Sequence, residues 1–487
     1  MTAEEVLKQV FGYDRFREGQ RYLIDALAGG RDALGILPTG GGKSLCYQVP
    51  ALMRDDGITV VISPLISLMK DQVMALKARG VAAAYLNSTL TPSQLALANE
   101  RAMRGQYRII YVAPERLKTP SFRQLAEAQR IRLLAVDEAH CVSQWGQDFR
   151  PDYLGIGEFL ESLPERPVLG AFTATATEAV RRDIIRLLKM RSPTSITTGF
   201  DRPNLYFGVR KVEQAEKENA LEELLGRYRE QSVIVYCSSR KTVDRLAELL
   251  KTRGWAAAAY HAGLPEDIRR EAQEAFTADR VRVMVATCAF GMGIDKPDVR
   301  CVIHYNMPRS PEAYYQEAGR AGRDGKPGEC VLLCAPNDVA AARYVLMNSE
   351  PNPALTPQQQ AFIRKQDLVR LESMERYTET GACLRQHLIR YFGQKAPAEC
   401  GNCSSCLRKQ KTRPALPFRP KGRPRMDLSG IVPGATVWHQ RFGEGRIESI
   451  DPDKHRMTVI FAHDTKQFAY PDALYSAYLT AEKPGKL

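Results

Sequence analysis

The sequence predicts an α/β protein with two tandem parallel-sheet domains, a helical module and a small C-terminal β-barrel. Short apolar runs alternate with helical patterns through the first part of the chain, and this pattern restarts near residue 200. The last part of the chain instead shows short strands around turns. Strands separated by helices indicate βαβ units and a parallel sheet, whereas closely spaced short strands favour a barrel.

The expected elements follow in chain order. In the first domain, residues 1–205, we expect strands at 33–37, 59–62, 108–112, 133–136 and 168–172. In the second, residues 206–340, we expect strands at 232–236, 256–260, 281–286, 299–304 and 330–333. A helical module at 341–408 and a linker at 409–428 precede a barrel at 429–487, with strands at 437–439, 445–450, 457–461 and 465–469. Two tandem sheets leave a cleft between them.

The linker has an unusual composition. Residues 408–425 contain eight Lys or Arg, four Pro and no acidic residue. This composition is typical of an extended, disordered segment. Contact between its charges and phosphate is the alternative.

Net charge and hydropathy limit the classes of partner that the sequence predicts. The net charge is +13, which suggests a polyanion such as nucleic acid, although a basic balance can also serve solubility alone. We find no apolar run of about 18 residues, and the N-terminus has no apolar signal core. We therefore expect a cytoplasmic protein without a membrane partner, and a monomer.

A glycine-rich run follows the first predicted strand and precedes a helical pattern. It comprises Thr39, Gly40, Gly41 and Gly42, followed by Lys43 and Ser44. Glycines let backbone N–H groups turn toward phosphates, and a helix N-terminus adds positive potential. Lys43 would reach the outer phosphates and Ser44 would bind Mg²⁺. Leu37 stands where the strict pattern has Gly or Ala, so a flexible glycine turn is the alternative.

Two adjacent acids follow the apolar strand at 133–136. Ligands bind at the carboxyl ends of such strands. Asp137 would hold Mg²⁺ through water, and Glu138 would polarise the attacking water. An exposed acid pair is common alone, but together with Lys43 and Ser44 it predicts hydrolysis of a nucleoside triphosphate.

Two arginines three residues apart in the second domain share a helical face. We expect Arg323 to act as an arginine finger on the triphosphate, with Arg320 beside it. The alternative is a surface salt-bridge pair. If the finger interpretation holds, the active site is complete only when the two domains close.

Four of the eleven cysteines are clustered: Cys383, Cys400, Cys403 and Cys406. Closely spaced Cys-x-x-Cys pairs can share one tetrahedral ion, and in a cytosolic chain a metal is a better interpretation than disulfides. We expect a structural Zn²⁺ site, with reactive redox thiols as the alternative. The other seven are expected to be small core residues.

An ordered series of motifs resembles the RecQ family of helicase superfamily two over residues 5–408. It comprises FGYDRFREGQ at 11–20, SPLISL at 63–68, APER at 113–116, DEAH at 137–140, FTATA at 172–176, YHAGL at 260–264, AFGMGID at 289–295 and QEAGRAGRDG at 316–325. The resemblance implies two RecA-like motor domains, ATP-dependent 3′-to-5′ DNA unwinding and a zinc module ending near residue 408.

The same resemblance assigns roles by position. Tyr13, Arg17 and Gln20 match the adenine-recognition motif, where an aromatic ring stacks on the base and an amide hydrogen-bonds to it.

Residues 140–151 match the aromatic-rich loop of the family. Trp145 and Phe149 would stack on unpaired bases, and Arg150 would contact phosphate. A buried aromatic cluster is the alternative. Thr173 and Thr175 would link the nucleotide site to the DNA-binding face, or would simply cap a helix.

The family pattern stops after the zinc module. No winged helix follows, and the tail at 432–446 resembles the Tudor-like barrel that ends UvrD-type helicases. Such a barrel could bind a protein partner or nucleic acid. Strand separation would then need another element.

We therefore expect a RecQ-type DNA helicase that acts on single-stranded and forked DNA in recombination and repair. A single-stranded-DNA translocase with weak unwinding and an RNA helicase are the alternatives. Intact Lys43, Asp137, Glu138 and Arg323 argue against a DNA clamp with a decayed motor.

Overall fold

The computed structural model describes residues 1–480 except 147, 292–295, 413–429, 440–441 and 476–478. Two compact units divide the chain, Met1–Gln410 and Lys411–Leu487, and each is described separately. Most of the predicted linker, part of the 289–295 motif and Gln147 of the aromatic-rich loop lie outside the described residues. No helix in the described part of the chain is both long and apolar enough to cross a membrane.

The first parallel sheet has seven strands in the order β3-β4-β2-β5-β6-β1-β7. Its strands are β1 (Ala33–Ile36), β2 (Ile58–Ile62), β3 (Ala83–Leu86), β4 (Ile109–Val112), β5 (Ile131–Val136), β6 (Val168–Thr173) and β7 (Thr194–Thr197). The five predicted strands are present, and β3 and β7 join them at the two edges. The central strands are buried along their length, as expected for a parallel sheet covered on both faces.

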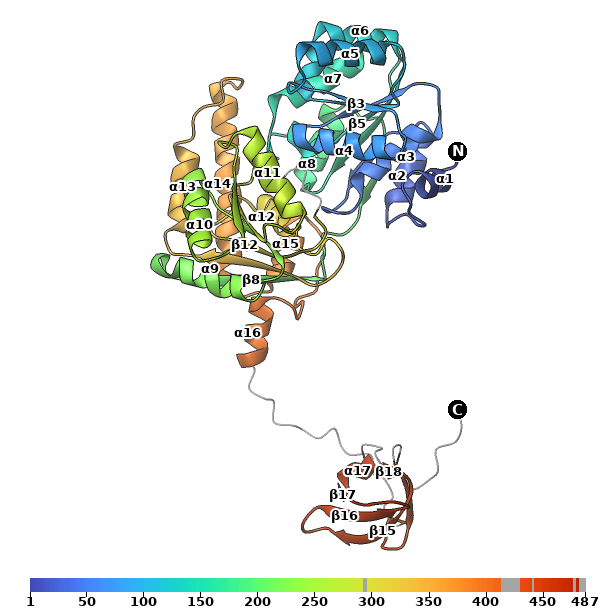
Figure 1. The fold of residues 1–487 in the computed structure, drawn as a ribbon, viewed down its shortest axis with the longest axis vertical. Coiled ribbons are helices and arrows are strands. Elements are labelled where there is room, and N and C mark those ends of the chain that lie inside the picture. Colours follow the sequence, from blue (N-terminus) through green and yellow to red (C-terminus); the bar gives the residue numbers. More distant parts are fainter. Residues whose placement is uncertain (147, 292–295, 413–429, 440–441, 476–478, 481–487) are drawn as a thin grey trace. The chain divides into compact units, whose positions relative to one another are not determined.

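Helices connect these strands and pack around the sheet (Figure 1). They are α1 (Ala3–Gln9), α2 (Gln20–Ala28), α3 (Lys43–Met53), α4 (Ile66–Ala78), α5 (Pro92–Met103), α6 (Pro120–Ala128), α7 (Gly155–Ser162) and α8 (Glu178–Leu187), with 3₁₀ helices η1 (Pro114–Lys118), η2 (Ala139–Val142) and η3 (Pro151–Leu154). Strands β1, β5 and β6 are adjacent in the sheet. Their carboxyl ends therefore bring the glycine-rich run, the acid pair and Thr173 to one edge.

The second parallel sheet has six strands in the order β10-β11-β9-β12-β13-β8. They are β8 (Leu205–Lys211), β9 (Ser232–Tyr236), β10 (Ala257–Tyr260), β11 (Val283–Ala286), β12 (Val299–His304) and β13 (Gly328–Cys334). The connecting helices are η4 (Gln214–Glu216), α9 (Lys217–Gly226), α10 (Arg240–Thr252), α11 (Glu266–Thr277) and α12 (Pro311–Ala318). The five predicted strands are present, and β8 is an additional edge strand.

The cysteine module packs on the second sheet. It contains α13 (Asp338–Met347), α14 (Pro357–Glu379), α15 (Leu384–Tyr391) and α16 (Ser404–Thr412). A backbone bridge joins Cys403 to Phe207 of β8, and the amide of Val209 donates to Ser404 Oγ at 3.2 Å. The edge strand β8 therefore ties the module to the motor core.

The C-terminal unit is an antiparallel sheet in the order β17-β16-β15-β14-β18. Its elements are β14 (Thr436–His439), β15 (Gly443–Asp451), β16 (Arg456–Phe461), β17 (Thr465–Ala469), α17 (Asp472–Tyr475) and β18 (Leu479–Thr480). The four predicted strands are present. Among the described residues no strand pairing joins β17 to β18, so the sheet is a curled half-barrel, which is consistent with the small β-barrel predicted from the sequence.

Candidate active site

The glycine-rich run forms a loop between β1 and α3. Gly40 and Gly42 have φ values of 79° and 75°, in the left-handed region that favours glycine. Gly42 is the N-cap residue of α3, and Lys43 is its first residue. Backbone N–H groups at this helix start therefore face the position that phosphates would take.

Two predicted adenine-site residues hold this loop in place. Gln20 Nε2 donates to the carbonyls of Gly41 and Gly42 at 3.2 and 3.0 Å, and Arg17 Nη1 donates to the carbonyl of Gly40. A Cβ atom on Gly42 would lie 2.4 Å from Gln20 Nε2. Tyr13 lines a cavity that this loop also borders. Of its surface, 52 % is exposed, which leaves its ring open for stacking.

The acid pair follows β5 directly. The amide of Asp137 donates to the carbonyl of Ile62 at 2.8 Å, and Tyr153 Oη donates to the carbonyl of Asp137 at 3.0 Å. Glu138 has φ 46° and ψ 45°, a conformation that is uncommon for a non-glycine residue and often marks functional sites.

Burial and neighbouring charges shift the pKa values of the two carboxyl groups in opposite directions. Burial, followed by the neighbouring Glu138 charge, raises the pKa of Asp137. Burial also acts to raise the pKa of Glu138, but His140 and the Lys43 charge outweigh it and lower the pKa. Glu138 is therefore held as a carboxylate beside Lys43.

A polar chain runs from Glu138 to the second domain. His140 Nδ1 lies 3.3 Å from Glu138 Oε2 and 2.8 Å from Thr173 Oγ1. Thr173 Oγ1 donates to the carbonyl of Thr175 at 3.1 Å, and Gln316 Nε2 of α12 donates to Thr175 Oγ1 at 3.0 Å. The two threonines thus lie between the acid pair and a helix of the second domain.

The predicted nucleotide and catalytic residues share one cavity of about 590 Å³. Its lining includes the side chains or backbone of Tyr13, Arg17, Gln20, Thr39, Gly40, Gly42, Lys43, Ser44, Asp137, Glu138, Arg320 and Arg323. Arg320 and Arg323 come from the segment after α12, so both domains contribute to the cavity. Gly41 does not line this cavity, and its carbonyl accepts a hydrogen bond from Gln20 Nε2.

Arg202 is a residue of this site that the sequence did not single out. Its Nη1 donates to the carbonyls of Thr39 and Gly319, both at 3.3 Å, and its Nη2 donates to those of Ala321 and Gly322, both at 3.1 Å. Arg202 therefore joins the glycine-rich loop to the segment that carries the two arginines. All four acceptors are backbone carbonyls, and no side-chain spacing in the sequence marks such contacts.

The aromatic-rich loop begins with η2, directly after Glu138. Trp145 is 42 % exposed and Phe149 is half-buried. Arg150 is engaged within the protein, since its guanidinium contacts Asp148 Oδ2 at 3.1–3.2 Å and donates to the carbonyl of Pro64 at 3.2 Å. Base stacking by the two rings and phosphate contact by Arg150 stay predictions.

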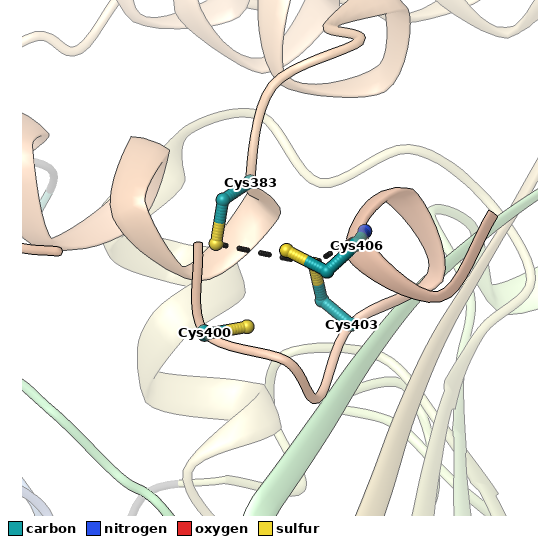
Figure 2. A group of neighbouring side chains, drawn as sticks. All are labelled: Cys383, Cys400, Cys403 and Cys406. Atoms are coloured by element: carbon teal, nitrogen blue, oxygen red, sulfur yellow. Dashed lines mark hydrogen bonds between the residues drawn. The ribbon is translucent and has the colours of Figure 1, made fainter. Parts of the chain in front are cut away.

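The four clustered cysteines converge on one point (Figure 2). Their Sγ atoms lie within 4.8 Å of one another. Zn–S bonds of about 2.3 Å in a tetrahedron place sulfur atoms about 3.8 Å apart, so the cluster fits a Zn²⁺ ion without a free coordination position. Burial acts to raise the pKa of Cys403, but the amide hydrogen bonds of Cys406 and Leu384 outweigh it and lower the pKa. At Cys400 and Cys406 burial prevails and the pKa is raised.

Three family models match successive parts of the chain. The DEAD/DEAH box helicase model matches residues 17–183, the helicase conserved C-terminal domain matches 216–325, and the RecQ zinc-binding model matches 336–407. The third match identifies the four-cysteine cluster as a zinc site of the RecQ type.

Named relatives agree with these matches, and a solved structure shares the fold. The chain is 45 % identical over 405 residues to the ATP-dependent DNA helicase RecQ of Bacillus subtilis, covering 83 % of this chain and 66 % of the relative. It is 42 % identical over 346 residues to the probable ATP-dependent DNA helicase RecS of the same organism, covering 70 % and 69 %. The structure of Saccharomyces cerevisiae Dbp5 bound to RNA and ADP BeF3 matches with a TM-score of 0.58 at 20 % identity, covering 75 % of this chain and 97 % of that one.

The fold and the cavity thus define a helicase-type protein with two RecA-like domains. The chain belongs to the RecQ family. It spans slightly less than two thirds of the length of the RecQ protein of Bacillus subtilis, because 66 % of that relative is covered.

Proposed function

We propose that this chain is an ATP-dependent DNA helicase of the RecQ type, which moves 3′ to 5′ on single-stranded and forked DNA in recombination and repair. One observation supports this proposal above the others. A single cavity combines the phosphate-loop lysine and the acid pair of one RecA-like domain with two arginines of the other, in a chain of the RecQ family.

The side chains would divide the reaction between them. Lys43 and the loop amides would bind the phosphates of ATP, and Glu138, held as a carboxylate, would accept a proton from the attacking water. Arg323, with Arg320 beside it, would stabilise negative charge on the terminal phosphoryl group. Tyr13, Arg17 and Gln20 would recognise the adenine.

The implied metals fit the residues present. Ser44 and Asp137 line the cavity together and offer the hydroxyl and carboxylate oxygens that Mg²⁺ prefers. Bound Mg²⁺ would neutralise charge on the triphosphate. Zn²⁺ at the four cysteines would stabilise the fold of the module and take no part in hydrolysis.

Nucleic-acid stimulation of ATP hydrolysis tests the choice of substrate. We expect single-stranded DNA to stimulate turnover strongly and RNA of the same sequence to stimulate it weakly. Equal or stronger stimulation by RNA would favour an RNA helicase. No ATP turnover with either would favour a DNA clamp.

A translocase with weak unwinding is the second candidate. It is favoured by the C-terminal unit, whose described residues form an antiparallel half-barrel where a duplex-splitting winged helix would stand. Strand displacement on forked and tailed duplexes, with and without residues 411–487, separates the two. Rapid single-strand movement without displacement would support the translocase.

The remaining expectations are also proposals. The C-terminal unit resembles a Tudor-like barrel in its sequence and would bind a protein partner. We propose that the chain acts as a monomer in the cytoplasm. Size-exclusion chromatography with light scattering tests the monomer directly.

A further inference from the structure

A tight turn carries the exposed tryptophan of the aromatic-rich loop. We call residues 143–146 the Trp145 turn. The amide of Gly146 donates to the carbonyl of Ser143 at 2.9 Å, and the amide of Trp145 donates to Ser143 Oγ at 3.1 Å. A Cβ atom on Gly146 would lie 2.5 Å from the carbonyl oxygen of His140, so this close approach requires glycine.

Helix α14 of the cysteine module contacts this turn at two places. Arg370 Nη2 donates to the carbonyl of Gly146 at 2.9 Å in a buried contact, and Asp367 Oδ1 accepts from Arg370 Nη1 at 2.5 Å. The ring of Phe362 meets the Trp145 ring edge to face, with 5.1 Å between centroids and 87° between planes. Phe362 and Arg370 lie eight residues apart, so about two turns of α14 span both contacts.

We propose that α14 is the support that positions the Trp145 turn for stacking on DNA bases and links DNA occupancy to ATP hydrolysis. Arg370 and Phe362 are positioning residues that act through the turn. This inference rests on the proposed function, because it assumes that DNA stimulates hydrolysis.

The two contacts immobilise Trp145 but leave part of its ring accessible for base stacking. Phe362 covers part of the indole, while 42 % of the Trp145 surface stays exposed. A charge-assisted hydrogen bond from a buried arginine fixes the adjacent carbonyl. A ring that is already immobilised loses less conformational freedom when a base stacks on it, which strengthens DNA binding.

A short segment connects the turn to the hydrolytic centre. The four residues of η2, Ala139–Val142, fill the gap between Glu138 and Ser143. Asp148, Arg370, Glu138 and Gln316 also line one cavity of about 370 Å³. A displacement of the turn is therefore transmitted to Glu138 through one turn of helix.

Tryptophan fluorescence tests the contact without DNA. The chain has three tryptophans, so Trp255→Phe with Trp438→Phe leaves Trp145 as the only reporter. In this background we expect Arg370→Gln and Phe362→Ala to shift the emission maximum to longer wavelength. Lys365→Gln and Val369→Ala, which change exposed residues of the same helix, should leave it unchanged.

DNA-dependent ATP turnover tests the linkage. For Arg370→Gln and Phe362→Ala we expect the single-stranded DNA concentration at half-maximal stimulation to rise about tenfold, as for one weakened stacking contact. For Phe362→Ala, turnover without DNA should stay within about twofold of wild type, because Phe362 lines neither the cavity of about 590 Å³ nor the cavity of about 370 Å³. Phe362→Tyr should restore the wild-type value.

The outcomes separate two failures. A wild-type chain whose ATP turnover ignores single-stranded DNA would refute the proposed function and the linkage with it. Alternatively, DNA stimulates the wild type while Arg370→Gln and Phe362→Ala both match it in emission maximum and in the DNA concentration at half-maximal stimulation. That result would refute the role of α14 alone.

Discussion

At the residue scale, Arg202 shows how one side chain can join two domains through backbone groups. Its guanidinium donates to four carbonyls, one in the glycine-rich loop and three beside the two predicted catalytic arginines. Arginine suits this role because its planar fork presents several donors at once. The geometry of the ATP cavity therefore depends on a residue that does not line it.

Truncation of Arg202 should slow catalysis more than it weakens nucleotide binding. Arg202→Ala leaves carbonyls without their donor, which costs about 1–3 kcal/mol each where no water replaces it. We expect kcat for ATP to fall about tenfold with a smaller change in KM, measured by steady-state phosphate release. Arg104→Ala, at an exposed arginine paired with Glu100, is the control. A larger effect on KM than on kcat would contradict a positioning role.

The phosphate-loop lysine gives a sharper prediction. Lys43→Ala removes the ammonium group expected at the outer phosphates, so ATP turnover should fall to background while single-stranded DNA binding, measured by fluorescence anisotropy, stays within about threefold. Lys70→Ala changes an exposed lysine of α4 and should not alter either quantity. Full turnover in Lys43→Ala would refute the loop assignment.

At the element scale, the cysteine module is joined to the motor by β8 and α14. Cys403 pairs with Phe207 of β8, while Arg385 of α15 contacts Asp201 and the carbonyls of Arg202 and Leu205. The module that carries the zinc cluster thus contacts both the Arg202 segment and the Trp145 turn. Loss of zinc should weaken the stimulation of ATP turnover by DNA before it lowers turnover without DNA.

Cys403→Ser should release the metal. We expect zinc content to fall from one ion per chain to well below half after dialysis against a chelator, because one lost ligand weakens binding by more than about tenfold. Atomic absorption measures the zinc, and basal ATP turnover should remain above about half of wild type. Cys288 was expected in the core but is exposed, and it lies outside the cluster, so Cys288→Ser is the control. Zinc retention by Cys403→Ser would contradict the ligand assignment.

The four strands that the sequence did not predict, β3, β7, β8 and β18, all lie at the edge of a sheet. Three of them are short, because β3 and β7 have four residues each and β18 has two, whereas β8 has seven. Their pairing is decided by the neighbouring strand, so local patterns carry little signal. The central strands were predicted because burial on both faces demands continuous apolar runs.

At the scale of the whole molecule, some residues of the site could be predicted from the sequence and others could not. Lys43, the acid pair, the arginines and the cysteines lie in contiguous motifs, so the sequence predicted that they would meet. Arg202 and Arg370 act on carbonyls far away in the chain, and only folding brings them there. The small C-terminal β-barrel predicted from the sequence is consistent with the half-barrel that the described strands form. How far such a sheet closes depends on pairing between its edge strands, which local patterns do not show.

The central claim is that ATP hydrolysis requires a cavity built by both RecA-like domains. The most direct test is single-turnover ATP hydrolysis by Arg323→Ala with saturating single-stranded DNA. We predict that the rate constant falls about a thousandfold or more, as for a lost arginine finger, while a fluorescent ATP analogue still binds within about fivefold of wild type. A rate constant within about threefold of wild type would contradict the account.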